Sequence, residues 1–280
     1  MLFGRKNCTQ CGSSYDIVSD TCPACKCRDE NFETLGIPKN IFWLPIWKQI
    51  VIFVIGLIGL NAISLILQVF FTLFNPSFAT DHYATYVTVI NTSRYVLCAI
   101  GIACILIGEY PKFKPHLKKW YPWVIGIGFA GALLVSSMIW SNIVNLFYKT
   151  EGNENQQVVN LVIGSYPITS ILLLGILGPL VEEFTYRVGL YSFFRRINKY
   201  LAYVITIVIF AFIHFNFTAK GDEMINELWN IPSYIISGFL LTLAYEKFGI
   251  SCSVVAHVGN NLYGVVMTII LNLLKQYVGS

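Results

Sequence analysis

Charged side chains are scarce in this sequence: Asp, Glu, Lys and Arg together make up 12% of its 280 residues. A soluble globular protein usually has about one quarter of its residues charged. Hydrophobic residues make up 55% of the chain. They gather in several runs of about 20 residues, the length at which a helix crosses the hydrocarbon core of a bilayer. The scarcity of charge therefore excludes a soluble globular protein of this length, and the apolar runs predict a multi-pass helical membrane protein.

Two further absences narrow the class of protein. The chain lacks the alternating segments of about ten residues that mark a transmembrane β-barrel. It also lacks an apolar segment close to the N-terminus, so we expect no cleavable signal peptide. The first apolar run begins near Ile50 and is long enough to act as a signal anchor. The predicted fold class is an all-α, polytopic bundle of transmembrane helices.

We predict seven spans, and the fourth of them is too long for one simple crossing. Pro167 lies within it and is expected to divide it into an interfacial helix and a tilted span, because proline interrupts the hydrogen bonds of a helix. That division would give eight helices in all. The predicted spans are about 49–74, 83–108, 122–148, 159–194, 200–217, 230–247 and 250–272.

Basic residues fall in every second loop of this scheme. Positively charged loops stay in the cytoplasm, so we expect the N-terminus inside the cell and, after seven spans, the C-terminus outside. The expected location is the plasma membrane of a bacterium, with the bilayer as a partner and no nucleic acid bound. The basic residues that carry this argument are Lys112, Lys114, Lys118 and Lys119 after the second span and Arg195, Arg196 and Lys199 after the fourth.

Five of the eight cysteines stand in the polar segment that precedes the first span. Cys8 with Cys11 and Cys22 with Cys25 form two CxxC pairs, the spacing of a zinc ribbon that holds a structural, closed Zn²⁺ site. Because this short segment has little hydrophobic core, the bound metal would supply its folding energy. Cys27 is either a spare thiol or a replacement for Cys25. The alternatives are disulfides, which are rare in the cytoplasm, or free thiols.

Ionisable residues are few within the predicted spans, where they are costly and usually functional. Helical spacing of four places Glu183 beside Arg187, and the adjacent Glu182 and Glu183 point about 100° apart. One acid can therefore face a cavity while the other is held by the arginine. The same spacing pairs Phe210 with His214 and His257 with Asn261. The ionisable residues within spans are Arg94, Glu182, Glu183, Arg187, His214 and His257.

A rise of about 1.5 Å per residue puts Glu182, His214, His257 and Asn261 at similar depths in their spans. A carboxylate, two imidazoles and an amide suit hydrolysis. The carboxylate can take a proton from water, and an imidazole can orient the water, bind a metal or stabilise an oxyanion, as an amide can. The sequence contains neither a GxSxG nor an HExxH motif. Activation of water therefore fits better than a covalent nucleophile or a zinc protease of the HExxH type.

Three segments of the chain resemble the motifs of the CPBP intramembrane proteases, also called the type II CAAX prenyl endopeptidase or Abi family. The EExxxR motif is matched by "EEFTYR", the FxxxH motif by "FAFIH" and the HxxxN motif by "HVGNN", in the same order and with similar separation. The resemblance covers about residues 160–272. Val188 departs from it, because many members have Gly directly after the Arg, and only some members carry an N-terminal zinc ribbon.

The resemblance implies a membrane-embedded endopeptidase domain at 40–280, preceded by a cytoplasmic zinc ribbon and linker at 1–39. By that resemblance Glu182 activates water with the help of His214. His257 and Asn261 would form the oxyanion hole. The supporting residues would be Glu183, Arg187 and Phe210.

Metal and substrate stay open at this point. Members of the family have been described both as metal-dependent and as glutamic peptidases; we favour the glutamic form without a catalytic metal, although Glu182, His214 and His257 could make a His₂Glu zinc set. The expected substrate is a membrane-associated peptide or protein. The alternative function is a non-catalytic bacteriocin self-immunity or membrane-binding protein, with the zinc ribbon as a docking module for a protein partner.

Overall fold

A computed structural model describes residues 2–29, 37–149 and 153–278. Six helices in these ranges are long and apolar enough to cross a membrane: Ile46–Phe74, Tyr83–Lys118, Tyr121–Asn145, Pro167–Arg195, Asp222–Phe248 and Ile250–Val278. A seventh apolar helix, Lys199–Phe212, is shorter. The prediction of an all-α membrane bundle behind a small cysteine-rich head is confirmed. The linker residues 30–36 lie outside the described residues, and the division at residue 39 stays a prediction.

The first half of the bundle consists of two long rods and one single helix. Apolar side chains that no helix covers, such as Leu65 and Ile66, lie on these rods, as expected of a surface that faces lipid. The elements are α1 (Ile46–Val54), η2 (Ile55–Gly59) and α2 (Leu60–Phe74); α3 (Phe78–Asp81); α4 (Tyr83–Leu106), η3 (Ile107–Glu109) and α5 (Tyr110–Lys118); and α6 (Tyr121–Asn145).

The second half contains the three motifs. Its elements are α7 (Glu154–Ser165); α8 (Pro167–Ser170), η4 (Ile171–Leu177), α9 (Gly178–Glu183), η5 (Phe184–Tyr191) and α10 (Ser192–Arg195), which run on as one rod; α11 (Lys199–Phe212); α12 (Asp222–Phe248); and α13 (Ile250–Val278). The elements η4 and η5 are π-helical, a form that often occurs at functional sites. Helix α13 contacts α6, α12, η4 and α9, and so lies at the centre of the bundle.

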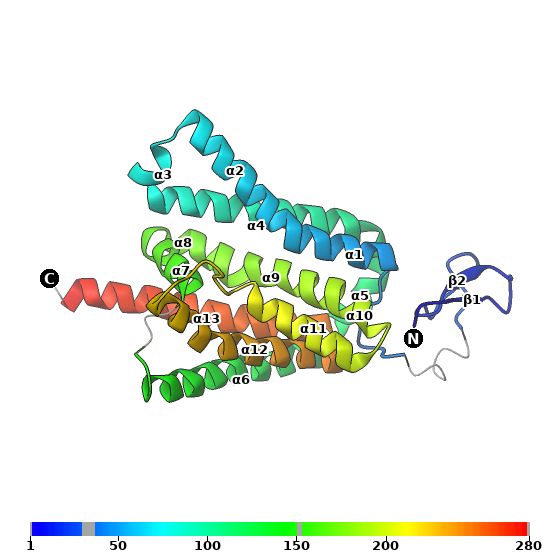
Figure 1. The fold of residues 1–280 in the computed structure, drawn as a ribbon. Helices are drawn as coiled ribbons and strands as arrows, with labels where there is room; N and C mark the ends of the chain where they lie inside the picture. Colours follow the sequence, from blue (N-terminus) through cyan, green and yellow to red (C-terminus); the bar gives the residue numbers. More distant parts are fainter. Residues whose placement is uncertain (1, 30–36, 150–152, 279–280) are drawn as a thin grey trace.

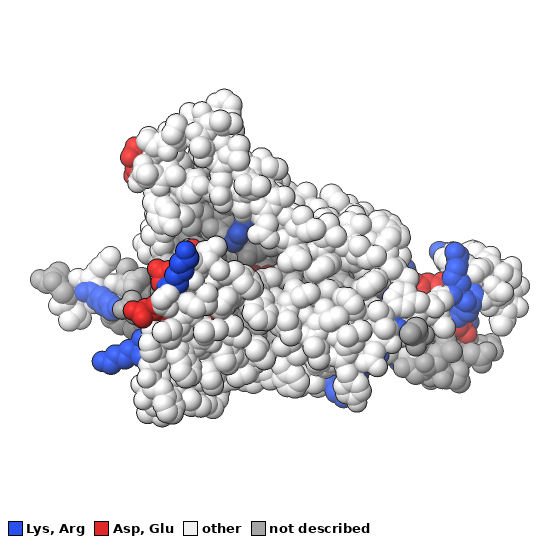
Figure 2. Space-filling view, viewed as in Figure 1, with Lys and Arg blue, Asp and Glu red and all other residues white. Residues whose placement is uncertain are grey.

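Figure 1 shows the α2–α4 pair as an upper layer, the α8–α10 rod beneath it, and α11, α12 and α6 below. The head and the C-terminus lie at opposite ends of the bundle (Figure 1). Charged side chains gather at these two ends, with a broad uncharged band between them (Figure 2). A hollow opens between the α2–α4 pair and the helices below, and basic atoms are visible inside it (Figure 2). This arrangement is that of a multi-pass membrane protein.

The structure confirms one predicted break and corrects two predicted boundaries. Helix α7 ends before Tyr166, and Pro167 begins the next helix, as proline is suited to do. The fifth predicted span, 200–217, is too long, because α11 ends at Phe212 and a turn follows it. The basic segment after the second span was expected to be a loop. It is the helix α5, which continues the α4 rod.

Two close approaches of backbones hold the α1–α2 rod against η5. A Cβ on Gly189 would lie 2.9 Å from the backbone nitrogen of Phe53, and a Cβ on Gly56 would overlap the side chain of Thr185. Small residues allow such contacts between membrane helices. The rod that carries the two motif glutamates is therefore fixed against the first membrane helix.

The head is a two-stranded antiparallel hairpin of β1 (Arg5–Asn7) and β2 (Ser14–Asp16). The first CxxC pair lies in its turn. The two CxxC knuckles have the same backbone hydrogen bonds. Gly12 N donates to Cys8 O in the first knuckle, and Lys26 N donates to Cys22 O in the second. Both donor residues, Gly12 and Lys26, have a positive φ. In the same way Cys8 N donates to Ser13 O and Cys22 N to Cys27 O. Cys27 thus occupies the place of Ser13.

Arg196 joins the head to the bundle. This side chain is fully buried, and its guanidinium donates to both carboxylate oxygens of Asp16 in β2, at 3.2 Å each. It also donates to Leu2 O at 3.1 Å, Leu44 O at 2.8 Å and Gln49 Oε1 at 3.1 Å. An arginine has five N–H donors, so every donor of Arg196 is used. The head is held at the end of the α8–α10 rod by a saturated polar contact.

Candidate functional site

The three motifs meet where the α9–η5 rod crosses α13 and the end of α11. Glu182 and Glu183 lie at the end of α9, His257 lies in α13, and Phe210 lies in the last turn of α11. Helix α13 contacts both α9 and η5, and α11 contacts η5. The packing of these helices therefore brings the three motifs together in one polar cluster inside an apolar bundle.

Glu183 is the centre of this cluster. Its Oε1 lies 2.9 Å from Nδ1 of His257 and 3.2 Å from Nη1 of Arg187. Glu183 and Arg187 are fully buried, and His257 is 6% exposed. The predicted pairing of Glu183 with Arg187 is present, and the contact with His257 adds to it. Because a carboxylate accepts, His257 donates from Nδ1, and its Nε2 is left to face the other side of the ring.

Glu182 lies on that other side. Its Oε2 is 3.8 Å from Nε2 of His257, and its Oε1 accepts a hydrogen bond of 3.0 Å from the hydroxyl of Tyr95 in α4. The side chain of Glu182 is 13% exposed, whereas that of Glu183 is fully buried. The two adjacent acids therefore have different surroundings, as their angular separation predicts: one is enclosed in an ion pair and the other is accessible.

Phe210 packs the site together. Its ring centroid lies 5.1 Å from that of His214 and 6.0 Å from that of His257, and the Cζ atom of Arg187 lies 4.7 Å from it. The cationic guanidinium is thus placed over an aromatic face, a favourable contact in a desolvated site. Tyr186 completes the packing with its ring edge-on to Phe210 at 5.6 Å.

His214 lies just past the end of α11. Its Nδ1 is 2.8 Å from the carbonyl oxygen of Phe210. A carbonyl oxygen only accepts, so the neutral ring carries its proton on Nδ1 and has its lone pair at Nε2. The ring also stacks in parallel on Tyr234, with centroids 4.4 Å apart and planes 12° apart.

Asn261 lies one turn beyond His257 in α13. Its Nδ2 donates to Leu174 O in η4 at 3.3 Å, and its Oδ1 accepts from Asn260 Nδ2 at 3.1 Å. These two bonds fix the direction of the amide. They leave one of its two N–H groups for another acceptor.

The four predicted zinc ligands come together in the head. The sulfur atoms of Cys8, Cys11, Cys22 and Cys25 all lie within 4.8 Å of one another. Zn–S bonds of about 2.3 Å in a tetrahedron require S–S separations of about 3.8 Å. The separations are 3.6 Å for Cys8 and Cys25 and 3.7 Å for Cys11 and Cys22. These four cysteines can hold a metal ion. Among the described residues, no other group of His, Cys, Asp and Glu is spaced closely enough to do so.

Cys27 lies within the same sulfur cluster, 3.1 Å from Cys8 Sγ and 3.0 Å from Cys25 Sγ. The backbone N–H of Cys11, followed by the Cys27 thiol, lowers the pKa of Cys8 to about 6. The hydrogen bond to Cys27 raises the pKa of Cys25 to about 11. One thiol of the head is therefore prepared as a thiolate at neutral pH, which is the form that binds metal.

Several residues of the site carry no motif. Tyr95 bonds Glu182 from 87 positions away in the chain, and Tyr234 reaches His214 from α12. Arg94 lies with its Cζ atom 5.2 Å from the centre of the ring of Tyr95. Its Nε is buried, with no hydrogen-bond partner among the described residues. Arg94 could be identified from the sequence because it is a charged residue within a predicted span. Tyr95 and Tyr234 could not be identified in this way, because tyrosines are common in this chain.

Sequence comparisons find relatives of this chain in Lactococcus lactis. Over 252 residues the chain is 27% identical to the UPF0177 protein YvdC of Lactococcus lactis, and the match covers 86% of this chain and 90% of YvdC. The UPF0177 protein YbdI of the same organism is 28% identical over 42% of this chain and 60% of its own length. The UPF0177 protein YxdF, also from Lactococcus lactis, is 32% identical over 37% of this chain and 52% of its own length. No solved structure matches the chain at a significant level.

A family model also matches the chain. It is that of the type II CAAX prenyl endopeptidase Rce1-like proteins, and it matches residues 164–263. This range holds all three motifs, and of the residues described above for the site in the bundle only Arg94 and Tyr95 lie outside it. The match confirms the resemblance on which the site was predicted. Over residues 164–263, then, this membrane protein is similar to the type II CAAX prenyl endopeptidase Rce1-like proteins.

Proposed function

We propose that this protein is an intramembrane endopeptidase that hydrolyses a peptide bond with water activated by Glu182. The observation that carries the proposal is the difference between the two adjacent acids. Glu183 is enclosed by Arg187 and His257, while Glu182 is accessible. Among the described residues, the imidazole of His257 at 3.8 Å is the nearest donor found for Oε2 of Glu182. A carboxylate in that position can take a proton from water.

Tyr95 and His214 assist the base in this proposal. The hydroxyl of Tyr95 holds Oε1 of Glu182 and so directs Oε2 away from α4. His214 presents an unprotonated Nε2, because its Nδ1 proton is given to Phe210 O. Such a nitrogen can accept a hydrogen bond from the attacking water and orient it. The water then loses its proton to Glu182 as its oxygen adds to the scissile carbonyl carbon.

His257 and Asn261 stabilise the oxyanion that this addition creates. Asn261 retains one free N–H beside its bond to Leu174 O. His257 donates from Nδ1 to Glu183, and in its protonated form it also donates from Nε2. An imidazolium between two carboxylates and beside Arg187 leaves the buried group without net charge. Preorganised donors of this kind lower the barrier most where water is excluded. The proton on Glu182 then passes to the leaving amine, and the peptide bond breaks.

The cysteine head is proposed to bind zinc in a structural role through Cys8, Cys11, Cys22 and Cys25. The S–S separations near 3.8 Å support four thiolates around one ion, with no position left for a water ligand. The bound ion would supply folding energy to a head with little core of its own. The basic segments at the head end, including α5, support a cytoplasmic N-terminus in a bacterial plasma membrane.

The function is tested by comparing membrane-protein fragments in cells that make the wild-type protein and cells that make Glu182→Gln. We expect a set of fragments that disappears in the variant, while the amount of the protein in the membrane is unchanged. A control is Asp81→Asn, which alters an exposed acid of α3 outside the site. Fragments that persist in Glu182→Gln would rule out the assigned base.

A further inference from the structure

His214 needs to be held by something other than its own helix. Helix α11 ends at Phe212, and the backbone N–H of His214 makes only a bond of 3.2 Å to Ala211 O. The residue therefore lies in a turn, where the backbone of a polypeptide is usually less constrained than in a helix. A catalytic imidazole has to be fixed to a fraction of an ångström, since misplacement by about 1 Å can cost about 100-fold in rate.

A buried asparagine holds the backbone of this turn. Asn153, which is 2% exposed, donates from Nδ2 to the carbonyl oxygen of His214 at 3.0 Å. Its Oδ1 accepts from the backbone nitrogen of Gln156 at 3.1 Å and caps α7. The same Oδ1 accepts from the hydroxyl of Tyr234 at 3.3 Å. One side chain thus connects His214, the start of α7 and α12.

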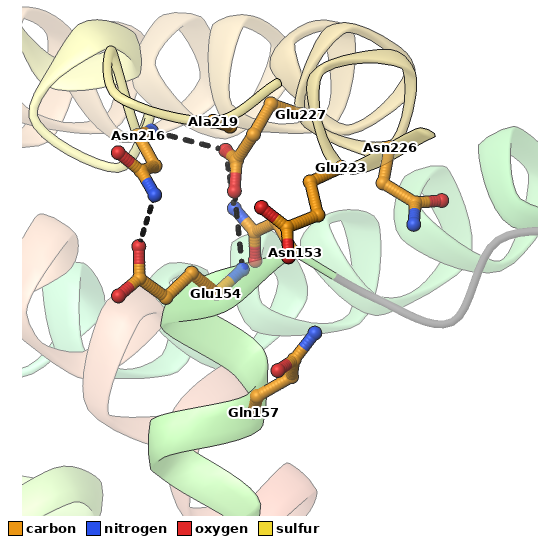
Figure 3. A pocket seen from close by; sticks show the side chains of 8 residues that line it. All are labelled: Asn153, Glu154, Gln157, Asn216, Ala219, Glu223, Asn226 and Glu227. Carbon is orange, nitrogen blue, oxygen red and sulfur yellow. Dashed lines mark hydrogen bonds between the residues drawn. The ribbon is translucent and has the colours of Figure 1, made fainter. Parts of the chain in front are cut away.

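A buried glutamate supports the asparagine. Glu227 of α12 is 3% exposed, and its carboxylate accepts from the backbone nitrogens of Glu154 at 3.1 Å and Asn216 at 3.2 Å. Asn153 Nδ2 lies 3.5 Å from the same carboxylate. Figure 3 shows these side chains turned toward one another beside a cavity of about 220 Å³, with Asn216 bonded to the carboxylate of Glu154. The turn after α11 is therefore bound at two points, His214 O and Asn216 N.

Tyr234 fixes the ring itself. The imidazole of His214 is already tied at Nδ1 to Phe210 O, which sets the tautomer but leaves the ring free to tilt about that bond. The parallel stack on Tyr234, with planes 12° apart, removes this freedom. The hydroxyl of the same tyrosine is bonded to Asn153. Tyr234 thus fixes the plane of the His214 ring, Asn153 fixes the backbone of His214, and a hydrogen bond joins Tyr234 to Asn153.

We propose that Asn153 and Tyr234 are positioning residues for His214: together they fix the plane of its ring and direct Nε2 at the water that Glu182 activates. This inference rests on the proposed function. Neither residue belongs to one of the three motifs. Glu227 supports Asn153 and is the third member of what we name the His214 clamp.

The test uses the full-length protein in detergent micelles and two independent measurements. The first is the NMR spectrum of ¹⁵N-labelled histidine side chains, with His214 assigned by His214→Gln. The second is cleavage of a fluorogenic peptide built on a site whose cutting depends on Glu182. Tyr234→Leu removes the stack, Tyr234→Phe keeps it, and Asn153→Ser keeps a cap for α7 but is too short to reach His214 O. Trp229→Leu removes another aromatic residue of α12 as a control.

We expect Tyr234→Leu and Asn153→Ser to lower kcat by about 10- to 100-fold with KM nearly unchanged. The His214 resonances should shift in both variants and move little in Tyr234→Phe, which should recover most of the rate. Trp229→Leu should match the wild type in both measurements. Unchanged kcat and unchanged His214 resonances in Tyr234→Leu and Asn153→Ser would overturn the clamp. Cleavage that survives Glu182→Gln would instead refute the function, and the NMR arm would still decide the clamp.

Discussion

His257 and Glu183 are joined by a contact of 2.9 Å between Nδ1 and Oε1, and both side chains are buried. Through this contact the third motif is tied to the first, although the two are 74 positions apart in the chain. Because Glu183 also binds Arg187, its carboxylate neutralises a guanidinium and orients an imidazole at the same time. Glu183 therefore has a part in stability that Glu182 does not share, and this difference can be measured.

Glu182→Gln and Glu183→Gln should have opposite profiles. In Glu183→Gln the guanidinium of Arg187 stays buried without its counter-ion, so we expect a loss of about 3–5 kcal/mol in the free energy of unfolding. In Glu182→Gln the unfolding temperature should stay near that of the wild type, while cleavage is lost. Thermal unfolding in detergent, followed together with cleavage, measures both. Equal loss of stability in the two variants would contradict the separation of roles.

Tyr95→Phe should lower cleavage without lowering stability. The variant keeps the ring beside Arg94 and loses only the hydroxyl that holds Oε1 of Glu182. A net contribution of about 1 kcal/mol for one hydrogen bond corresponds to a fall of about fivefold in kcat. Tyr86→Phe, on the same helix, serves as the control. The assignment fails if Tyr95→Phe cleaves as fast as the control.

The knuckles of the head make a prediction about the metal. Cys27 stands where the first knuckle has Ser13, so Cys27→Ser should retain one metal ion per chain. Cys25→Ser should lose it, because Cys25 is the counterpart of Cys11. Elemental analysis of the purified protein gives the answer directly. If Cys25→Ser retained the ion and Cys27→Ser lost it, the fourth metal ligand would be Cys27 and not Cys25.

Metal binding by the head should weaken as the pH falls. The Cys8 thiol has its pKa lowered to about 6, so it is a thiolate at neutral pH and becomes protonated as the pH falls through 6. The pKa of Cys25 is raised to about 11, so the incoming ion has to displace a proton there. Addition of Zn²⁺ to metal-free protein at pH 7.5 should release protons, which an indicator dye detects. No release on stoichiometric binding would contradict this account.

Arg196→Gln, at the end of the α8–α10 rod, should destabilise the protein far more than loss of an exposed arginine in the head. Leaving Gln49, the carbonyl of Leu44 and the partly exposed Asp16 without their donors should cost about 2–4 kcal/mol in the free energy of unfolding. Arg5→Gln provides the comparison, because Arg5 makes an exposed hydrogen bond to Ser14 O. Chemical unfolding followed by tryptophan fluorescence measures the difference. Equal effects of the two substitutions would show that the contact at Arg196 is dispensable.

The sequence predicted the parts of this molecule that depend on local spacing. The partners Glu183 and Arg187 are one turn apart, and the break at Pro167 follows from the ring of proline. The same reasoning failed at Phe212, where α11 ends inside an apolar run because Asn153 and Glu227 capture the backbone after it. Those residues lie in other helices, as do Tyr95 and Tyr234. Contacts between distant helices leave no periodic trace in one sequence, so only the fold could show them.

The saturated contact of Arg196 has a consequence for cells that lack metal. If the head unfolds, the guanidinium of Arg196 loses the carboxylate of Asp16 and the carbonyl of Leu2, and it keeps only Gln49 Oε1 and Leu44 O as partners. This change takes place at the end of the rod that carries Glu182 and Glu183. Loss of a metal ion from the head would then reach the membrane domain as a guanidinium without its carboxylate partner, so the ion supply would affect the bundle through Arg196.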